Sequence, residues 1–290
     1  MKKILALLLV TLLGVPALAT AADRHLLWEV RGPHATVWLL GSVHVLKPDE
    51  APLPPAADRA YDAAQRLVME VDLDAADADP MALMGQMQSA ALLPQGRTLR
   101  DVLAPDYDAI DRQARAAGLD LSALEGYAPW LAALTVLDLE LARRGYSPEY
   151  GIEQTLARRA ARDGKPIEGL ETAAEQFAML ASMPLPMQKR FLQMTLDESA
   201  DLDQELEDLL QAWRSGDTVA LAHMLEQESQ EFPDLYRRLT VDRNRAWAGK
   251  IDGMLRGDDD CLVIVGAMHL VGPESVVDLL RRRGYTVTQR

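Results

Sequence analysis

The stretch that organises this chain is Leu262 to Leu270, which reads LVIVGAMHL. Its first four residues are aliphatic and mostly β-branched, and the acidic turn from Gly257 to Asp260 precedes them. A continuous apolar run of this length, bounded by a turn, is typical of a central parallel strand. We therefore predict a buried strand over Leu262 to Val265, whose C-terminal end points to His269.

The same pattern occurs near the other end of the chain. Thr36 to Leu40 reads as a strand, and the next four residues, Gly41 to His44, repeat the Gly-x-x-His spacing. One such histidine is more often a hydrogen-bonded structural residue, but two copies in matching contexts favour a site. Because ligands in open α/β sheets bind outside the carboxyl ends of the strands, we expect His44 and His269 to lie there.

A carboxylate stands in the middle of the next predicted strand, Leu67 to Leu73, which reads LVMEVDL. If the strand alternates, Glu70 and Asp72 share a solvated face. If Glu70 is buried, it needs a partner. A strand that follows Gly-x-x-His in a strand, helix, strand unit would lie beside the first strand, so we favour Glu70 as a site residue.

The remaining segments are a short strand and two helical regions. Lys165 to Gly169 reads as the strand, and Glu171 comes just past its end, although an acid at a helix entry is also favoured by the helix dipole. Residues 80–147 and 184–256 read as helices. A long helix around Asp234 to Leu255 contains Arg243 and Asn244, a pair that by itself indicates no function.

The N-terminus predicts export. Lys2 and Lys3 precede an apolar run from Ile4 to Val15, and Ala17 to Ala19 supplies small residues for cleavage, so residues 1–22 are expected to be a signal peptide. The mature chain is then periplasmic or secreted, with no membrane span. We expect residues 23–290 to form one α/β domain with helical insertions at roughly 80–147 and 184–256.

Charge and cysteine content limit the function further. Removing Lys2 and Lys3 lowers the net charge from −14 to −16, because residues 1–22 contain no acidic side chain. Nucleic acid is therefore a poor partner. The single cysteine, Cys261, can form no internal disulfide, and core packing is its expected role.

The residue types expected at the sheet edge suit a metal ion. Two imidazoles and one or more carboxylates are ligands for a divalent cation such as Zn, Mn, Co or Fe. The chain has no His-Glu-x-x-His pair, no Gly-x-Ser-x-Gly elbow and no phosphate-binding glycine loop. The site would therefore be built from residues distant in the sequence.

Taken together, the segments resemble the TraB/GumN family, which is related to the Tiki metalloproteases and more remotely to erythromycin-esterase-like and ChaN-like proteins. The resemblance covers most of the mature chain. The segments that carry it are LWEV, VWLLGSVH, LVMEVDL, GIEQTL, GKPIEGLET, DRN and VIVGAMHLVGPESVVDLLRRRGYTV. Each is weak alone, and the combination is specific.

The resemblance implies a fold and a set of roles. The fold would be a mixed central β-sheet with paired strand-Gly-x-x-His motifs and a large helical insertion. By position, the metal ligands would be His44, His269 and Glu171. Glu70 would be a ligand or general base, and Arg243 and Asn244 could bind a substrate carboxylate or an oxyanion. The family usually has Asp where this chain has Glu153.

The leading hypothesis is thus an exported metal-dependent hydrolase that acts on peptide or protein bonds. The ChaN-like relatives suggest an alternative, a haem- or iron-binding envelope protein without catalysis. The acids beside the histidines argue against haem, which needs an apolar pocket. A third possibility is an envelope protein in which the same residues are only structural.

Overall fold

The computed structural model describes residues 25–50, 53–72, 79–198 and 202–290. The predicted signal peptide, residues 1–22, lies outside the described residues. Within these ranges, no helix has the length and apolar character needed to cross a membrane.

The chain forms a mixed α/β structure around one six-stranded sheet with the order β4-β3-β5-β2-β1-β6. The four strands β4, β3, β5 and β2 run parallel, and β1 and β6 add an antiparallel edge. The strand bounds are β1 (Leu27–Arg31), β2 (Thr36–Ser42), β3 (Arg66–Val71), β4 (Ile167–Glu171), β5 (Cys261–Gly266) and β6 (Thr286–Gln289). The predicted mixed α/β class is therefore confirmed.

Strand β5 is the central strand, as its sequence predicts. Residues Cys261 to Val265 are 0 % exposed, and both neighbours of the strand are parallel to it. The expectation that β3 lies directly beside β2 was wrong, because β5 lies between them. A strand without polar side chains loses nothing when both its faces are covered, so the most apolar strand takes the centre.

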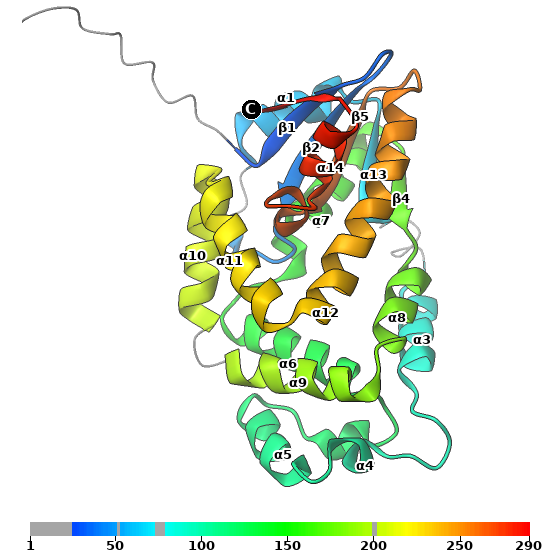
Figure 1. The fold of residues 1–290 in the computed structure, drawn as a ribbon, viewed down its shortest axis with the longest axis vertical. Helices are drawn as coiled ribbons and strands as arrows, with labels where there is room; N and C mark the ends of the chain where they lie inside the picture. Colours follow the sequence, from blue (N-terminus) through cyan, green and yellow to red (C-terminus); the bar gives the residue numbers. More distant parts are fainter. Residues whose placement is uncertain (1–24, 51–52, 73–78, 199–201) are drawn as a thin grey trace, which may run out of the picture.

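Helices cover both faces of the sheet (Figure 1). On one face, α1 (Pro55–Ala63) and α7 (Ile152–Asp163) lie side by side, joined by a hydrogen bond from Tyr61 to Asp163. On the other face, α13 (Asp242–Leu255) packs against α14 (Val276–Arg282). This alternation follows from right-handed crossovers, which place a helix on opposite faces when the strand order reverses.

The rest of the chain is helical, and part of it forms a second core beyond one end of the sheet. The α-helices of this part are α3 (Pro80–Ala91), α4 (Leu99–Leu103), α5 (Tyr107–Ala116), α6 (Pro129–Arg143), α8 (Ala173–Ala181), α9 (Leu185–Glu198), α10 (Leu202–Ser215), α11 (Thr218–Glu231) and α12 (Pro233–Tyr236). Short 3-10 turns are η1 (Pro48–Glu50), η2 (Leu121–Leu124), η3 (Pro148–Tyr150) and η5 (Ala267–Leu270). Side chains from α3 to α6, α8 and α9 pack into a cluster separate from the sheet core.

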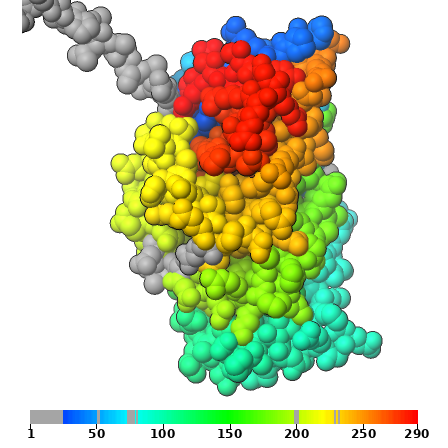
Figure 2. All heavy atoms as spheres, in the orientation of Figure 1, coloured from blue at the N-terminus to red at the C-terminus, as the bar shows by residue number. Residues whose placement is uncertain are grey.

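The carboxyl ends of the parallel strands face this helical part. In Figure 1 the β1–β2 turn lies at one end of the molecule and the helices α4 to α6 lie at the other. Figure 2 shows the same division on the surface, with residues of α4 and α5 at one end and C-terminal residues at the other. Any group held at the strand ends therefore lies between the sheet and the helical part.

The long helix expected around Asp234 to Leu255 is interrupted. A π-helical turn, η4 (Arg237–Val241), joins α12 to α13 directly before Arg243. Such turns insert one residue into a helix and are frequent at functional sites. Hydrophobic spacing alone did not predict this turn, because the segment stays helical on both sides of it.

Candidate functional site

The two motif histidines leave adjacent strands at the same edge of the sheet. Strand β2 ends at Ser42 and β5 ends at Gly266, and the two residues are partners in the parallel register. His44 follows β2 by two residues, and His269 lies in η5. The two motif glycines are not equivalent, since Gly41 lies inside β2 opposite Val265.

Gly266 marks the point where three candidate side chains meet. A Cβ atom placed on this glycine would lie 3.4 Å from His44 Nε2, 3.4 Å from Glu70 Oε1 and 3.5 Å from His269 Cδ2. Residues from β3 and from the segments after β2 and β5 therefore converge on one backbone position. The absence of a side chain at Gly266 keeps the space between them open.

Glu70 is buried rather than on a solvated face, so that alternative was wrong. The residue is 9 % exposed, and its Oε1 atom accepts the backbone N–H of Gly266 at 2.8 Å. Burial alone raises the pKa of its carboxyl, but the neighbouring His269 and Arg243 outweigh burial and hold this pKa at about 2. Glu70 is therefore an anion at neutral pH.

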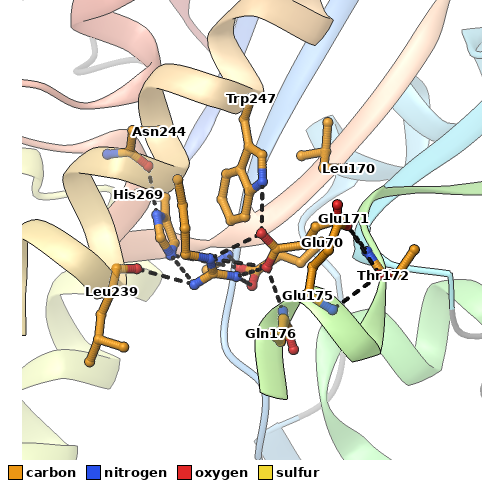
Figure 3. Close-up of polar contacts among 12 residues, drawn as sticks. Glu70, Leu170, Glu171, Thr172, Glu175, Gln176, Leu239, Asn244, Trp247 and His269 are labelled. Carbon is orange, nitrogen blue, oxygen red and sulfur yellow. Dashed lines mark hydrogen bonds and ion pairs between the residues drawn. The ribbon is translucent and has the colours of Figure 1, made fainter. Parts of the chain in front are cut away.

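Arg243 from α13 is the centre of the polar contacts, and Figure 3 shows the side chains of its partners Glu70, Glu171 and His269. Its Nη2 atom donates to Glu70 Oε2 at 2.6 Å and to Glu171 Oε1 at 2.5 Å. Its Nη1 atom lies 3.3 Å from His269 Nε2. The guanidinium also lies over the ring of Trp247, 4.5 Å from the centroid. One cation thus joins two carboxylates and one imidazole.

Glu171, the last residue of β4, lies on the other side of this guanidinium. Its carboxylate also accepts hydrogen bonds from Gln176 Nε2 at 2.8 Å and Trp247 Nε1 at 3.3 Å. A cavity of about 320 Å³ opens beside it and is lined by Arg243, Trp247 and Lys250, among others. Sequence reasoning missed Trp247 and Gln176, although each lies within five residues of a predicted site residue.

His269 is fixed by Asn244. The ring is 8 % exposed, and its Nδ1 atom lies 2.6 Å from Asn244 Oδ1. Asn244 is 1 % exposed and donates its Nδ2–H to the carbonyl of Glu274 at 2.9 Å. Burial lowers the pKa of His269 to about 4, so the ring is neutral at pH 7. With both ends of its amide engaged, Asn244 orients His269, a role different from the expected oxyanion contact.

His44 has a comparable partner in Glu153. The Nδ1 atom of His44 lies 2.7 Å from Glu153 Oε1, and the Ser42 hydroxyl donates to the same oxygen. The charge of Glu153 raises the pKa of His44, although the 63 % exposure of the ring lets solvent screen the pair. A Cβ atom on Gly151 would lie 2.1 Å from the His44 carbonyl oxygen, so glycine allows this close approach.

The side-chain types gathered here, imidazole and carboxylate, are ones that divalent metal ions use as ligands. Histidine ligands usually donate their second ring N–H to a carboxylate or carbonyl oxygen, and both His44 and His269 have such an oxygen at Nδ1. His44 then presents Nε2 toward Gly266, and His269 presents Nε2 toward Glu70 and Arg243. Within the described residues, however, no three His, Cys, Asp or Glu side chains are grouped closely enough to hold a metal ion. Arg243 takes the contacts to Glu70 and His269.

Comparisons with known proteins agree with the segments described above. The chain is 27 % identical over 247 residues to the uncharacterised protein YbaP of Escherichia coli strain K12, covering 84 % of this chain and 87 % of that protein. It is 26 % identical to an uncharacterised protein of Treponema pallidum strain Nichols, covering 93 % and 84 % of the two chains. No solved structure matches. The model of the TraB/PrgY/gumN family matches residues 26–289, and the chain therefore belongs to that family.

Proposed function

We propose that the protein is an exported hydrolase that depends on a divalent metal ion, Mn, Co, Zn or Fe, bound at the carboxyl ends of β2, β3 and β5. One observation carries the proposal: His44 Nε2, Glu70 Oε1 and the His269 ring surround Gly266. In both rings Nδ1 faces an acceptor oxygen. Histidine metal ligands usually donate the N–H of their other ring nitrogen to an oxygen in this way.

The residues that would hold the ion are His44, His269 and Glu70. His269 Nε2 and Glu70 Oε1 are 3.9 Å apart, a separation that one ion can bridge with ligand distances of roughly 2.0–2.2 Å. The family resemblance allowed both Glu70 and Glu171 as ligands, with Glu171 alternatively an orienting group. We favour Glu70 because its Oε1 atom lies near both histidines at Gly266, whereas Glu171 is bound by Arg243, Trp247 and Gln176.

Glu70 suits a ligand better than a general base. A carboxylate whose conjugate acid has a pKa of about 2 is a weak base and does not readily accept a proton at neutral pH. Such a carboxylate keeps its charge and is therefore available to a cation. A bound divalent ion would lower the pKa of a water molecule and polarise the carbonyl of the substrate.

Arg243 would stabilise negative charge on the substrate. Its guanidinium borders the cavity of about 320 Å³, and Glu171 and Trp247 hold it in place. Its donors contact Glu171, Leu239, Glu70 and His269, so it could donate to an oxyanion or a substrate carboxylate once Glu70 and His269 are engaged by the ion instead. The cavity lies between Arg243 and Lys250 and would receive the substrate.

The proposed export and the proposed peptide substrate are supported by different observations. Residues 1–22 have the basic start, apolar run and small-residue end of a signal peptide. Cleavage of peptide or protein bonds rests on the resemblance to the Tiki branch, which is a fold-level analogy.

The test is the metal content of protein purified from cells that express the full chain, without chelators or nickel affinity. Mass spectrometry should find about one Mn, Co, Zn or Fe per chain, and the metal should be lost in His44→Ala and His269→Ala. His223→Ala is the matched control, because that histidine is exposed on α11 and distant in the sequence from the site residues. The metal found is then used in a peptide-library screen.

The same preparations distinguish the competing functions. Absence of metal from the wild type, with no uptake of added ions, contradicts the metallohydrolase. A sharp absorbance band on addition of haemin that His269→Ala abolishes supports a haem-binding protein instead. If both substitutions only lower the melting temperature, the histidines are structural.

A further inference from the structure

The tautomer of His269 depends on a residue that touches neither the ring nor the space around Gly266. Glu274 has φ +60°, and among the described residues it is the one non-glycine with positive φ. Left-handed backbone is unfavourable for a glutamate and persists only where surrounding contacts impose it. Strained residues of this kind are frequent at functional sites.

The contacts that hold Glu274 come from three directions. Its carboxylate accepts hydrogen bonds from Arg245 Nη2 at 2.9 Å and Arg282 Nη1 at 2.6 Å. Its backbone N–H donates to Asp278 Oδ2 at 3.0 Å. The side chain is thus bound by α13 and α14, and its backbone is bound by α14. Together these contacts fix the direction of the Glu274 carbonyl.

That carbonyl determines which way the Asn244 amide points. A carbonyl oxygen only accepts hydrogen bonds, so the group of Asn244 that faces it at 2.9 Å must be the NH₂. The amide oxygen then faces His269 Nδ1 at 2.6 Å and can only accept, so Nδ1 must carry the proton. The lone pair of the neutral ring is left on Nε2, the atom nearest Glu70 and Arg243.

We infer that Glu274 is a positioning residue for His269: its left-handed backbone orients the Asn244 amide, and the amide fixes the Nδ1–H tautomer. This inference rests on the proposed function only for the use made of Nε2. The relay itself runs through backbone and amide atoms and does not require a bound metal. Its role is to keep the lone pair on Nε2, the ring atom that faces Glu70 and Arg243.

Two substitutions at Glu274 separate the backbone from the side chain. Both Glu274→Gly and Glu274→Ala remove the contacts to Arg245 and Arg282. Glycine adopts φ +60° without strain and keeps the carbonyl direction, whereas alanine, released from those contacts, relaxes toward negative φ. We expect the alanine variant to free the Asn244 amide and the glycine variant to leave it in place.

The readout is the ring ¹⁵N spectrum of His269 in the full chain, assigned by its loss in His269→Gln. Wild type and Glu274→Gly should give the Nδ1–H pattern, and Glu274→Ala should give a mixture of tautomers. Asn244→Leu removes the amide and should give the same mixture. The inference is overturned if folded Asn244→Leu or Glu274→Ala keeps the wild-type pattern, or if Glu274→Gly changes as much as Glu274→Ala.

Manganese binding by calorimetry adds a second arm. Loss of an orienting partner typically weakens a metal site by roughly 10–100-fold, so Glu274→Ala should bind Mn²⁺ at least about tenfold more weakly than Glu274→Gly. If the wild type binds no Mn²⁺, Co²⁺ or Zn²⁺, the proposed function fails while the ¹⁵N pattern still decides the role of Glu274. If the wild type binds metal and the two variants bind it equally, Glu274 does not position His269 for the metal.

Discussion

The positive charge of Arg243 is paired with two carboxylates, and all three side chains are mostly buried. The side chains of Arg243, Glu70 and Glu171 are 15 %, 11 % and 14 % exposed. In such a group each charge is stable only because the others are present, since none is well hydrated. The group thus replaces solvent for Glu70 and Glu171 and fixes both beside the histidines.

Replacing Arg243 by methionine should therefore be costly. Breaking a buried ion pair by removing one partner costs about 3–5 kcal/mol, because the remaining charge stays buried. Arg256→Met is the matched control just past the end of the same helix, where the exposed pair with Asp252 is screened by solvent and contributes little. Urea unfolding of both variants measures the difference, and equal losses would mean that Arg243 does not stabilise Glu70 and Glu171.

Substitution of Gly266 tests whether a metal ion binds between His44, Glu70 and His269. The methyl group of Gly266→Ala would lie at ordinary contact distance, 3.4–3.5 Å, from His44, Glu70 and His269. We expect stability to change by less than about 1.5 kcal/mol, as for a tolerated small-to-large change, and metal affinity to fall at least about tenfold. Calorimetry with Mn²⁺ and urea unfolding measure the two quantities.

Gly249→Ala is the control for that prediction, because a Cβ atom there meets nothing within 4 Å. In the middle of α13 this change should stabilise the protein slightly and leave metal affinity unchanged. Unchanged metal affinity in Gly266→Ala would show that the ion does not bind between these side chains.

The sequence identifies these residues unequally. His44, His269 and Glu70 follow from strand-end positions and from a carboxylate within an apolar strand, and all three meet at Gly266. The pairing of His44 with Glu153 could not be predicted, because their contact joins residues more than a hundred positions apart and depends on the entry of α7. The interactions of Arg243 likewise depend on a π-helical turn that apolar spacing does not show.

At the scale of elements, the contact between α1 and α7 has a measurable pH dependence. Burial, together with the hydrogen bond to Asp163, raises the pKa of Tyr61 from 10.0 to about 12. The folded state favours the neutral phenol, so its contribution is complete below pH 10 and is lost as the pH rises toward 12.

The melting temperature of the wild type should therefore fall more steeply between about pH 9.5 and pH 11.5 than that of Tyr61→Phe, which cannot ionise. Tyr127→Phe, at a partly exposed tyrosine, should behave like the wild type. Parallel curves for wild type and Tyr61→Phe would contradict the assignment of this alkaline sensitivity to the contact between α1 and α7.

The burial of a strand could be predicted from its own sequence, but the order of the strands in the sheet could not. The apolar run of β5 predicts a buried central strand, and that is confirmed. Chain order alone places β3 beside β2, and that was wrong, because β5 arrives from 190 residues later and pairs between them. Patterns within a segment specify burial, whereas the neighbours of a strand depend on competition among all strands of the chain.

At the scale of the whole molecule, the sheet and the helical part enclose the candidate site between them. The parallel strands end toward the helical part (Figure 1), and Arg243 and Asn244 of α13 contact His269 beyond the end of β5. The helical stretches were predictable from apolar spacing and helix-start signals. Their packing into a separate core was not, because spacing does not show which faces meet.

The whole chain is predicted to be exported and to lose its N-terminal segment. Protein recovered from the periplasm of an expressing bacterium should have lost about the first 22 residues, as the basic, apolar and small-residue pattern predicts. Intact-mass measurement of the periplasmic and cytoplasmic fractions checks this. Full-length mass confined to the cytoplasmic fraction would contradict export.

The position of the metal ion itself tests most directly whether His44, His269 and Glu70 bind it. A crystal grown with the ion found by mass spectrometry should give an anomalous peak roughly 2.0–2.2 Å from His44 Nε2, His269 Nε2 and a Glu70 oxygen. Arg243 should then remain on Glu171 and Trp247. A peak elsewhere would contradict a metal ion held by His44, His269 and Glu70. The same holds if Arg243 stays bound to Glu70 and His269 with no peak near them.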